Sequence, residues 1–400
     1  MRILAINVSD KGSTGYLAIS VLKYFEKKGH EVVLAVPNPS NQSVRTFNIS
    51  SSFLNRQFNR LMTKVLGNDG FLNKSNTKRL IRFINSYKPD IVHLHVLHGY
   101  FINIKLLLSF LKNTDIRVFW TFHDCWPFTG KCPHFLINNC YKWEHICSHC
   151  ISKHQYPKSY FFDFSKKMFL AKKNLFQNFN NLTIITVSEW LKLMTSKSIC
   201  SNLPLRVIRN GVDFSHIAIS VDDSSKKTTN VIKILAVANP WSQRKGIDFL
   251  NSFAEYCDKK NSPIRITCVG LTNKNNTYKT IERHGVVSRE DLSLFYKSTD
   301  VFVSFSREET FGMTIVEALF FGKPVVVMNN SGGSNEIASS DCGRSIDFGD
   351  CFSLEKSILE LNALTHNNSF SELCINRAKQ FSLEKMNAEY YTLMTKENEN

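Results

Sequence analysis

The residues with the clearest chemical potential are two glutamates, Glu309 and Glu317, on either side of a glycine. That glycine, Gly312, lies between the apolar run 301–305 and an apolar pattern typical of a helix. A strand-to-helix turn of this kind points backbone N–H groups and the positive end of the helix at an anion, most simply a phosphate. Carboxylates beside a phosphate would be suited to accept hydrogen bonds from sugar hydroxyls. The alternative is that Glu317 is a solvated helix residue and Glu309 a charge favoured by the helix dipole.

The flanking pattern predicts the elements that would hold these side chains. Strands are expected at 301–305 and 323–328, with a helix between them that begins at Gly312 and ends at Gly322. The start of the chain repeats the alternation, with a strand at 2–8, a glycine-containing turn, a helix to about residue 28 and a strand at 31–36. Such alternation predicts parallel α/β sheets with right-handed crossovers.

The 301–336 stretch resembles the donor-site signature of retaining GT-B glycosyltransferases of the family-4 type. The matching residues are Glu309, Phe311, Gly312, Met313 and Glu317, followed by Gly322, Pro324, Gly332, Gly333 and Glu336. The resemblance implies that Glu309 contacts the donor sugar and that Glu317 binds the ribose of the nucleotide. It also implies that backbone amides from Gly312 to Thr314 hold the diphosphate, beside Phe311.

The same resemblance extends to a lysine–glycine pair, Lys245 and Gly246, that follows the predicted strand 231–237. In the family this lysine binds the donor diphosphate. The family usually has an arginine five residues earlier, where this chain has Pro240, so we expect Arg244 to supply the second positive charge. Two cations beside a helix start would stabilise the departing diphosphate. A surface Arg–Lys pair at a turn is the simpler alternative.

Three further positions are assigned by the resemblance. His123 stands at the carboxyl end of a predicted strand, 117–121, where open α/β sheets bind ligands, and would reach the donor sugar. Gly15, in the first turn, would approach the donor phosphate, and the main chain around Val286 would contact the base. Without the resemblance, a single strand-end histidine or a glycine turn is more often structural.

A cysteine cluster interrupts the first half of the chain. Cys132, Cys140, Cys147 and Cys150 have the spacing C-x7-C-x6-C-x2-C. Four soft ligands so close together suggest a structural zinc site, although the first two spacings are not those of a standard zinc finger. Free thiols or a disulfide are the alternatives. The preceding HDCW-x-F-T-G segment with clustered cysteines resembles a subgroup of family-4 enzymes that build colanic acid, capsule and O-antigen polysaccharides.

Composition limits the partners. The 400 residues carry a formal charge of +16, which favours nucleotide-sugar phosphates or an anionic membrane face. No apolar run approaches the roughly 20 residues that span a bilayer, and the start lacks the apolar region of a signal peptide, so we expect a cytoplasmic protein. Basic and apolar residues interleave at 53–82 and 158–176, predicted as helices, which suggests either a membrane-facing surface or a solvated face over a core. The basic residues are dispersed and match no nucleic-acid motif, so no nucleic-acid partner is expected.

Together, these features predict a GT-B fold of two Rossmann-like α/β domains with parallel sheets facing a cleft. The expected domains are an acceptor-side domain at 1–205, with a cysteine-rich insertion at 125–154, a nucleotide-sugar domain at 206–380, and a helix at 381–400 that returns to the first domain. The resemblance implies transfer of a sugar, with retention, from a UDP- or GDP-sugar to a glycan or lipid-linked glycan, without a cofactor. A GT-B epimerase or phosphorylase, or an inactive nucleotide-sugar-binding scaffold, is the alternative.

Overall fold

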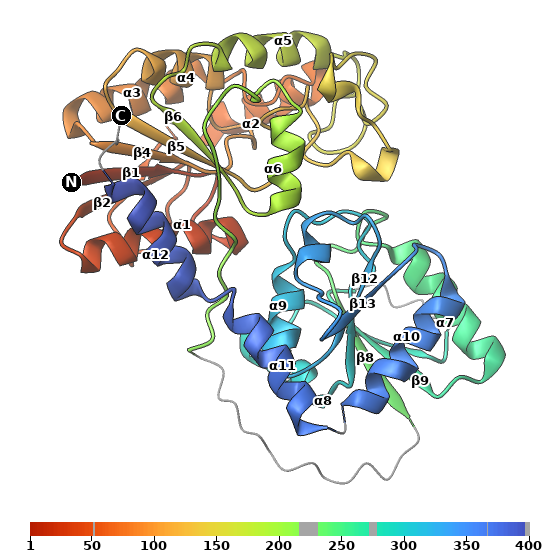
Figure 1. Cartoon of the computed structure of the whole chain (residues 1–400). Helices are drawn as coiled ribbons and strands as arrows, with labels where there is room; N and C mark the ends of the chain where they lie inside the picture. Colours follow the sequence, from red (N-terminus) through yellow and green to blue (C-terminus); the bar gives the residue numbers. More distant parts are fainter. Residues whose placement is uncertain (51–52, 216–230, 272–277, 366, 397–400) are drawn as a thin grey trace. The chain divides into compact units, whose positions relative to one another are not determined.

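The computed structural model describes residues 1–50, 53–215, 231–271, 278–365 and 367–396 and divides into two compact units (Figure 1). One unit contains Met1–Arg209 and the chain from Met386 on, and the other is Asn210–Lys385. The predicted end of the first domain, at residue 205, therefore lies inside the first unit, a few residues before Arg209, after which the chain enters the second unit.

The first unit is built on a seven-stranded parallel sheet with the order β3-β2-β1-β4-β5-β6-β7. Its central strands are buried apolar runs, as expected for a parallel sheet covered by helices on both faces. The strands are β1 (Arg2–Ile6), β2 (Glu31–Val36), β3 (Thr46–Asn48), β4 (Ile91–Leu94), β5 (Arg117–Phe122), β6 (Leu182–Thr186) and β7 (Leu205–Val207).

The second unit has a six-stranded parallel sheet with the order β10-β9-β8-β11-β12-β13. The strands are β8 (Ile232–Val237), β9 (Ile264–Val269), β10 (Ile281–His284), β11 (Val301–Val303), β12 (Val325–Met328) and β13 (Gly343–Ile346). In each unit the order reverses at one place, between β1 and β4 and between β8 and β11. Loops that leave the carboxyl ends of the strands at such a reversal line a crevice in which α/β proteins bind ligands.

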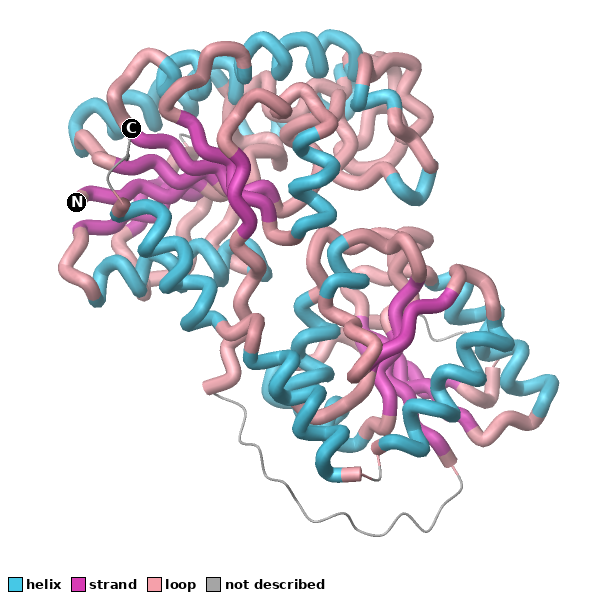
Figure 2. The backbone as a smooth tube through the Cα atoms, in the orientation of Figure 1, coloured by secondary structure: helices cyan, strands magenta, loops and turns pink. Residues whose placement is uncertain are grey.

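Helices pack on both faces of each sheet (Figure 2). In the first unit they are α1 (Gly12–Lys27), α2 (Phe53–Leu66), α3 (Lys74–Tyr87), α4 (Ile104–Lys112), α5 (Ser165–Phe176) and α6 (Glu189–Ser196), with the short 3-10 turns Leu136–Asn138 and Lys142–Glu144. In the second unit they are α7 (Ile247–Lys260), α8 (Arg289–Ser298), α9 (Met313–Phe320), α10 (Cys351–Leu364) and α11 (Asn368–Lys379), with the 3-10 turn Gly333–Glu336.

The last helix, α12 (Leu383–Thr395), packs on the first unit through its later part. The side chain of Asn387 hydrogen-bonds to Ser20 of α1 at 3.0 Å, and the hydroxyl of Tyr390 lies 3.0 Å from that of Thr121 on β5. Arg117 donates a hydrogen bond of 2.7 Å to the carbonyl of Met394. Residues far apart in the sequence thus share one buried core.

Two sequence-based expectations about local structure were wrong. The sequence GVVS at 285–288, ahead of a helical pattern, predicts the end of a strand, but β10 stops at His284 and these residues form the loop before α8. The helix predicted from residue 158 begins only at Ser165, because residues 158–164 follow an irregular path. There the carboxylate of Asp163 accepts the backbone N–H groups of Cys150 and Ser165, and thereby turns the chain into the helix.

Within the described residues, no helix is both long enough and apolar enough to cross a bilayer.

Candidate functional site

Two loops meet at the carboxyl edge of the second sheet, where its strand order reverses. One follows β8 and carries Arg244 and Lys245, and the other follows β11 and carries Glu309. The backbone N–H of Arg307 donates a hydrogen bond of 2.9 Å to the carbonyl of Arg244, which ties the loops together. The reversal therefore brings together residues that are 64 positions apart in the sequence.

Glu309 is the centre of this cluster. Its Oε1 accepts hydrogen bonds from Lys245 Nζ and, at 2.8 Å, from the hydroxyl of Ser306. Its Oε2 lies 4.0 Å from Arg244 Nη1, which also donates a hydrogen bond of 2.9 Å to the carbonyl of Glu308. All three charged side chains are largely buried but keep a solvent-facing part. The cluster is thus a carboxylate held between two cations.

Electrostatics keep Glu309 ionised. Burial by itself would raise the pKa of this carboxyl, but Lys245 and Arg244, together with the hydrogen bonds from Lys245 and Ser306, lower its pKa to about 2. At neutral pH Glu309 is therefore an acceptor of hydrogen bonds and Lys245 a donor. A ligand with both hydroxyl and phosphate groups could find partners at both residues.

The second glutamate, Glu317 on α9, belongs to a neighbouring group of polar side chains. Glu317 Oε2 accepts a hydrogen bond of 2.9 Å from the hydroxyl of Tyr296, and Oε1 lies 3.9 Å from Arg289 Nη2. Burial raises the pKa of Glu317, against the opposing effects of Tyr296 and Arg289. Both partners come from α8, so the packing of α8 against α9 orients this carboxyl group.

The start of α9 has the features expected of an anion site. Gly312 precedes it with φ at 110°, in the positive region that favours glycine, and no side chain caps the helix. The backbone of Met313 and Thr314 forms the first turn of α9, and the side chain of Phe311 is buried. Uncapped N–H groups at a helix start are suited to bind phosphate oxygens.

Gly246 allows the two loops to approach one another. A Cβ at this position would lie 2.0 Å from the carbonyl oxygen of Phe305, and φ is +74°. Gly246→Ala is therefore expected to destabilise the fold by about 1–3 kcal/mol and to displace Lys245 from Glu309. Thermal unfolding of the variant measures the effect, with Gly285→Ala, whose Cβ would meet open space, as the control. Equal melting temperatures for both variants would contradict the argument.

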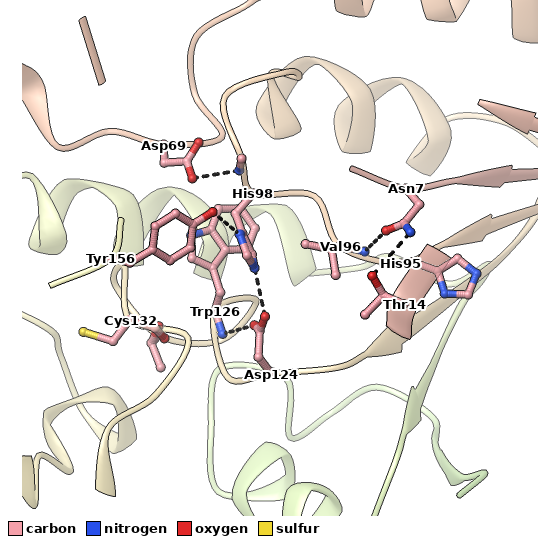
Figure 3. Close-up of polar contacts among 12 residues, drawn as sticks. Asn7, Thr14, Asp69, His95, Val96, His98, Asp124, Trp126, Cys132 and Tyr156 are labelled. Carbon is pink, nitrogen blue, oxygen red and sulfur yellow. Dashed lines mark hydrogen bonds and ion pairs between the residues drawn. The ribbon is translucent and has the colours of Figure 1, made fainter. Parts of the chain in front are cut away.

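The first unit has a corresponding polar edge where β1 and β4 lie side by side (Figure 3). Asn7 Oδ1 accepts the backbone N–H of Val96 at 3.2 Å, and its amide nitrogen donates to the carbonyl of Ser9 at 2.8 Å. Gly15 lies in the first turn of α1, where a Cβ would be 2.5 Å from the backbone carbon of Asp10. Gly15 thus has a packing reason to be glycine, in addition to the ligand contact predicted for it.

His123 follows β5, as predicted, and has a histidine neighbour that was not assigned a role. His95 Nδ1 and His123 Nε2 are 3.1 Å apart, and their rings are stacked with centroids 5.4 Å apart. Burial lowers the pKa of His123 to about 4, although Asp124 opposes this change. His123 is therefore neutral at pH 7, and one of its ring nitrogens is committed to His95.

A second group at this edge consists of His98, Asp124, Tyr156 and Asp69 (Figure 3). His98 Nε2 lies 2.8 Å from Asp124 Oδ2, and Nδ1 lies 2.9 Å from the hydroxyl of Tyr156. Burial would lower the pKa of His98, but Asp124 and Asp69 raise it overall. Asp69 accepts the backbone N–H groups of Gly99 and Tyr100, each at 2.9 Å, which fixes the loop after β4.

The zinc site predicted for the four cysteines stays a prediction. Cys132 and Cys150 have sulfurs 3.8 Å apart, whereas the sulfur of Cys147 accepts the backbone N–H of Gly130 at 3.1 Å. None of the four predicted ligands, Cys140 included, forms a disulfide. In the part of the chain that the structure describes, no group of three or more histidine, cysteine, aspartate or glutamate side chains is arranged to hold a metal.

The predicted residues therefore fall into separate groups. Arg244, Lys245 and Glu309 are in contact, and Glu317 and the start of α9 share one helix. Val286 is exposed in the loop before α8. Gly15 and His123 belong to the other unit. Sequence patterns did not reveal Ser306, Tyr296, Arg289 or His95, because each acts through a contact made by packing.

Comparisons with known proteins agree with this architecture. A model of "Glycosyltransferase Family 4" matches residues 15–216, and one of "Glycosyl transferases group 1" matches residues 222–381. The putative colanic acid biosynthesis glycosyl transferase WcaC of Escherichia coli is 23% identical over 286 residues, which cover 69% of this chain and 67% of WcaC.

Solved structures resemble the whole described fold. A glycosyltransferase from Rickettsia africae superposes with a TM-score of 0.66 at 17% identity and covers 98% of this chain and 97% of its own. HepE from Anabaena, solved in complex with UDP, has a TM-score of 0.63 at 14% identity, with 99% and 100% coverage. With both family models matched in order along two parallel-sheet units, the chain belongs to glycosyltransferase family 4 and has the GT-B fold.

Proposed function

We propose that the protein transfers a sugar, with retention of configuration, from a nucleoside-diphosphate sugar to a hydroxyl group of a glycan acceptor. The observation that carries this proposal is the cluster of Lys245, Arg244 and Glu309 at the strand-order reversal of the second sheet. Its two cations and the uncapped start of α9 suit a diphosphate, and its ionised carboxylate suits a sugar hydroxyl.

The roles follow from charge. Lys245 and Arg244 would bind the diphosphate and stabilise the negative charge that develops as it leaves. Glu309 would accept a hydrogen bond from the donor sugar, Glu317 would bind the ribose, and His123, neutral at pH 7, would orient the sugar. Cationic side chains and helix amides would compensate charge in place of a divalent metal ion.

Retention is proposed to occur on one face of the sugar. The bond from the anomeric carbon to the diphosphate oxygen breaks, and the acceptor oxygen bonds to the same face of that carbon. The acceptor's proton passes to the departing diphosphate, so that charge and atoms balance. This path requires a diphosphate held firmly in place, which is the task that the Lys245 cluster would perform.

The biological setting is proposed from the relatives. WcaC is named for colanic acid biosynthesis, and HepE was solved with UDP, which supports a UDP-sugar donor and a surface polysaccharide as product. A GDP-sugar is the alternative donor. A lipid-linked glycan as acceptor, at the cytoplasmic face of a membrane, fits the positive charge of the chain.

A donor panel tests the proposal. Purified protein is titrated calorimetrically with UDP-, GDP-, ADP- and dTDP-sugars, and product formation is followed with and without acceptor glycans. We expect saturable binding of one donor and transfer that requires an acceptor. Turnover of the donor sugar without acceptor would instead indicate an epimerase, and binding without any turnover would indicate an inactive scaffold.

A further inference from the structure

The first unit carries an exposed apolar surface on α2 that faces away from the core. Leu54, Phe58 and Leu61 recur at helical spacing along one side of this helix and are 76%, 61% and 60% exposed. On the opposite side the polar residues Asn59 and Thr63 are buried. A helix on a globular protein normally buries its apolar side and exposes its polar side. In α2 this arrangement is inverted.

A second exposed segment adjoins α2. Tyr160, Phe161 and Phe162 are all exposed, with Phe161 at 69%. The backbone N–H of Tyr160 donates a hydrogen bond of 2.8 Å to the carbonyl of Lys64 near the end of α2. Ser159 packs against Gly67, immediately after that helix. We call the six residues Leu54, Phe58, Leu61, Tyr160, Phe161 and Phe162 the outer apolar patch.

The backbone around the outer apolar patch is held in place by hydrogen bonds. Lys153 Nζ donates a hydrogen bond of 2.8 Å to the carbonyl of Phe161, and the backbone N–H of Ser159 donates one of 2.9 Å to the carbonyl of Lys153. Asp163 fixes the end of the segment by accepting the N–H groups of Cys150 and Ser165. The aromatic side chains are thus presented outward by a supported loop, and they come from a stretch predicted to be helical.

Charge favours one kind of occupant. The α2 sequence contains three basic residues and no acidic one. Residues 153–167 contain four lysines and a single acidic residue, Asp163, whose carboxylate is engaged by backbone amides. Exposed Lys158, Lys166 and Lys167 accompany the aromatic side chains. A symmetric contact with a second copy would bring equal positive charges together and is disfavoured.

We infer that the outer apolar patch docks on the surface of an anionic lipid bilayer. Apolar and aromatic side chains would enter the boundary between headgroups and acyl chains, while the surrounding lysines and arginines contact anionic headgroups. The inference deepens the proposed function, because a lipid-linked acceptor would be presented at that surface. The evidence for this inference is the outer apolar patch itself, and its test needs neither donor nor acceptor.

Co-sedimentation of the full chain with vesicles tests this inference. Vesicles of phosphatidylcholine with roughly 40% anionic phosphatidylglycerol are compared with vesicles of pure phosphatidylcholine. We expect binding to the anionic vesicles that is at least about tenfold stronger and that weakens in high salt. Equal binding to both vesicles, or no binding to either, would overturn the inference.

Variants locate the surface. Two double variants, Phe58→Ser/Leu61→Ser and Phe161→Ser/Phe162→Ser, are each expected to reduce vesicle binding by about tenfold or more. Each removes apolar side chains that would otherwise pass from water into the bilayer. The matched control is Phe352→Ser/Leu373→Ser, which removes exposed apolar residues from the second unit and should leave binding unchanged. Patch variants that bind vesicles like the unaltered protein would overturn the inference.

Two further readouts separate the explanations. Sedimentation velocity without lipid is expected to show that the unaltered chain does not self-associate through the patch. Self-association that the patch variants abolish would identify a second copy as the occupant and would overturn the membrane assignment. Nucleotide-sugar binding in solution should be the same for the patch variants and the unaltered chain. If the unaltered protein binds the donor but not the vesicles, only the membrane-docking inference is rejected. If it binds the vesicles but no donor, the proposed function is rejected.

Discussion

Lys245→Ala is expected to reduce sugar transfer by about 10²–10³-fold, since it removes a cation from the site where the leaving diphosphate gains charge. The same substitution should weaken binding of the free nucleoside diphosphate, because Lys245 would contact it in the ground state as well. Steady-state kinetics and calorimetry with UDP or GDP measure the two effects. The loop itself is expected to stay folded, since the Arg307–Arg244 backbone hydrogen bond does not involve this side chain.

Lys259→Ala is the matched control for this prediction. Lys259 lies near the end of α7, the helix that follows the Lys245 loop, and pairs on the surface with Glu255 at 2.6 Å. Exposed pairs of this kind contribute little to stability, so transfer and melting temperature should both stay near those of the unaltered protein. If Lys245→Ala and Lys259→Ala both retained near-normal transfer rates, the assignment of the diphosphate site to this cluster would be wrong.

Glu309→Gln is expected to lower the transfer rate by about 10²-fold, through loss of a charged acceptor that positions the donor sugar. Its effect on nucleotide affinity should have the opposite sign to that of Lys245→Ala. Without the carboxylate, Lys245 and Arg244 lose their internal counter-charge. They should then attract a diphosphate at least as strongly as before. Comparison of the dissociation constants for the free nucleotide in the two variants measures this contrast.

The contrast distinguishes a donor site from a structural ion pair. If Glu309 and Lys245 only stabilised the fold, both substitutions would lower the melting temperature and would affect nucleotide binding in the same direction. Ser306→Ala serves as the control for Glu309, because it removes the hydrogen bond of 2.8 Å from an uncharged donor and leaves the charges in place. A modest effect from Ser306→Ala, beside a large one from Glu309→Gln, is expected.

Much of this protein could be predicted from its sequence, because the relevant signals are local. Apolar runs bounded by glycine-containing turns indicate buried parallel strands, and β1, β2, β8 and β12 lie where those runs predicted them. The motif around Glu309 and Gly312 indicated the candidate donor site that we propose, since a glycine before a helix and a carboxylate in the preceding loop are neighbours in the sequence. Even so, β11 ends at Val303, and the aromatic segment 158–164 forms a loop where helical spacing had suggested a helix.

Only the tertiary structure decided which distant residues meet. The reversal of strand order between β8 and β11 brings Lys245 to Glu309, and the packing of α8 against α9 brings Tyr296 to Glu317. The cysteine spacing suggested a metal site, but only the structure shows which of these sulfurs are neighbours, with those of Cys132 and Cys150 lying 3.8 Å apart. In α2 the sequence specifies an amphipathic helix but not which side is buried. That choice depends on what the rest of the unit packs against it, and here the apolar side is left exposed.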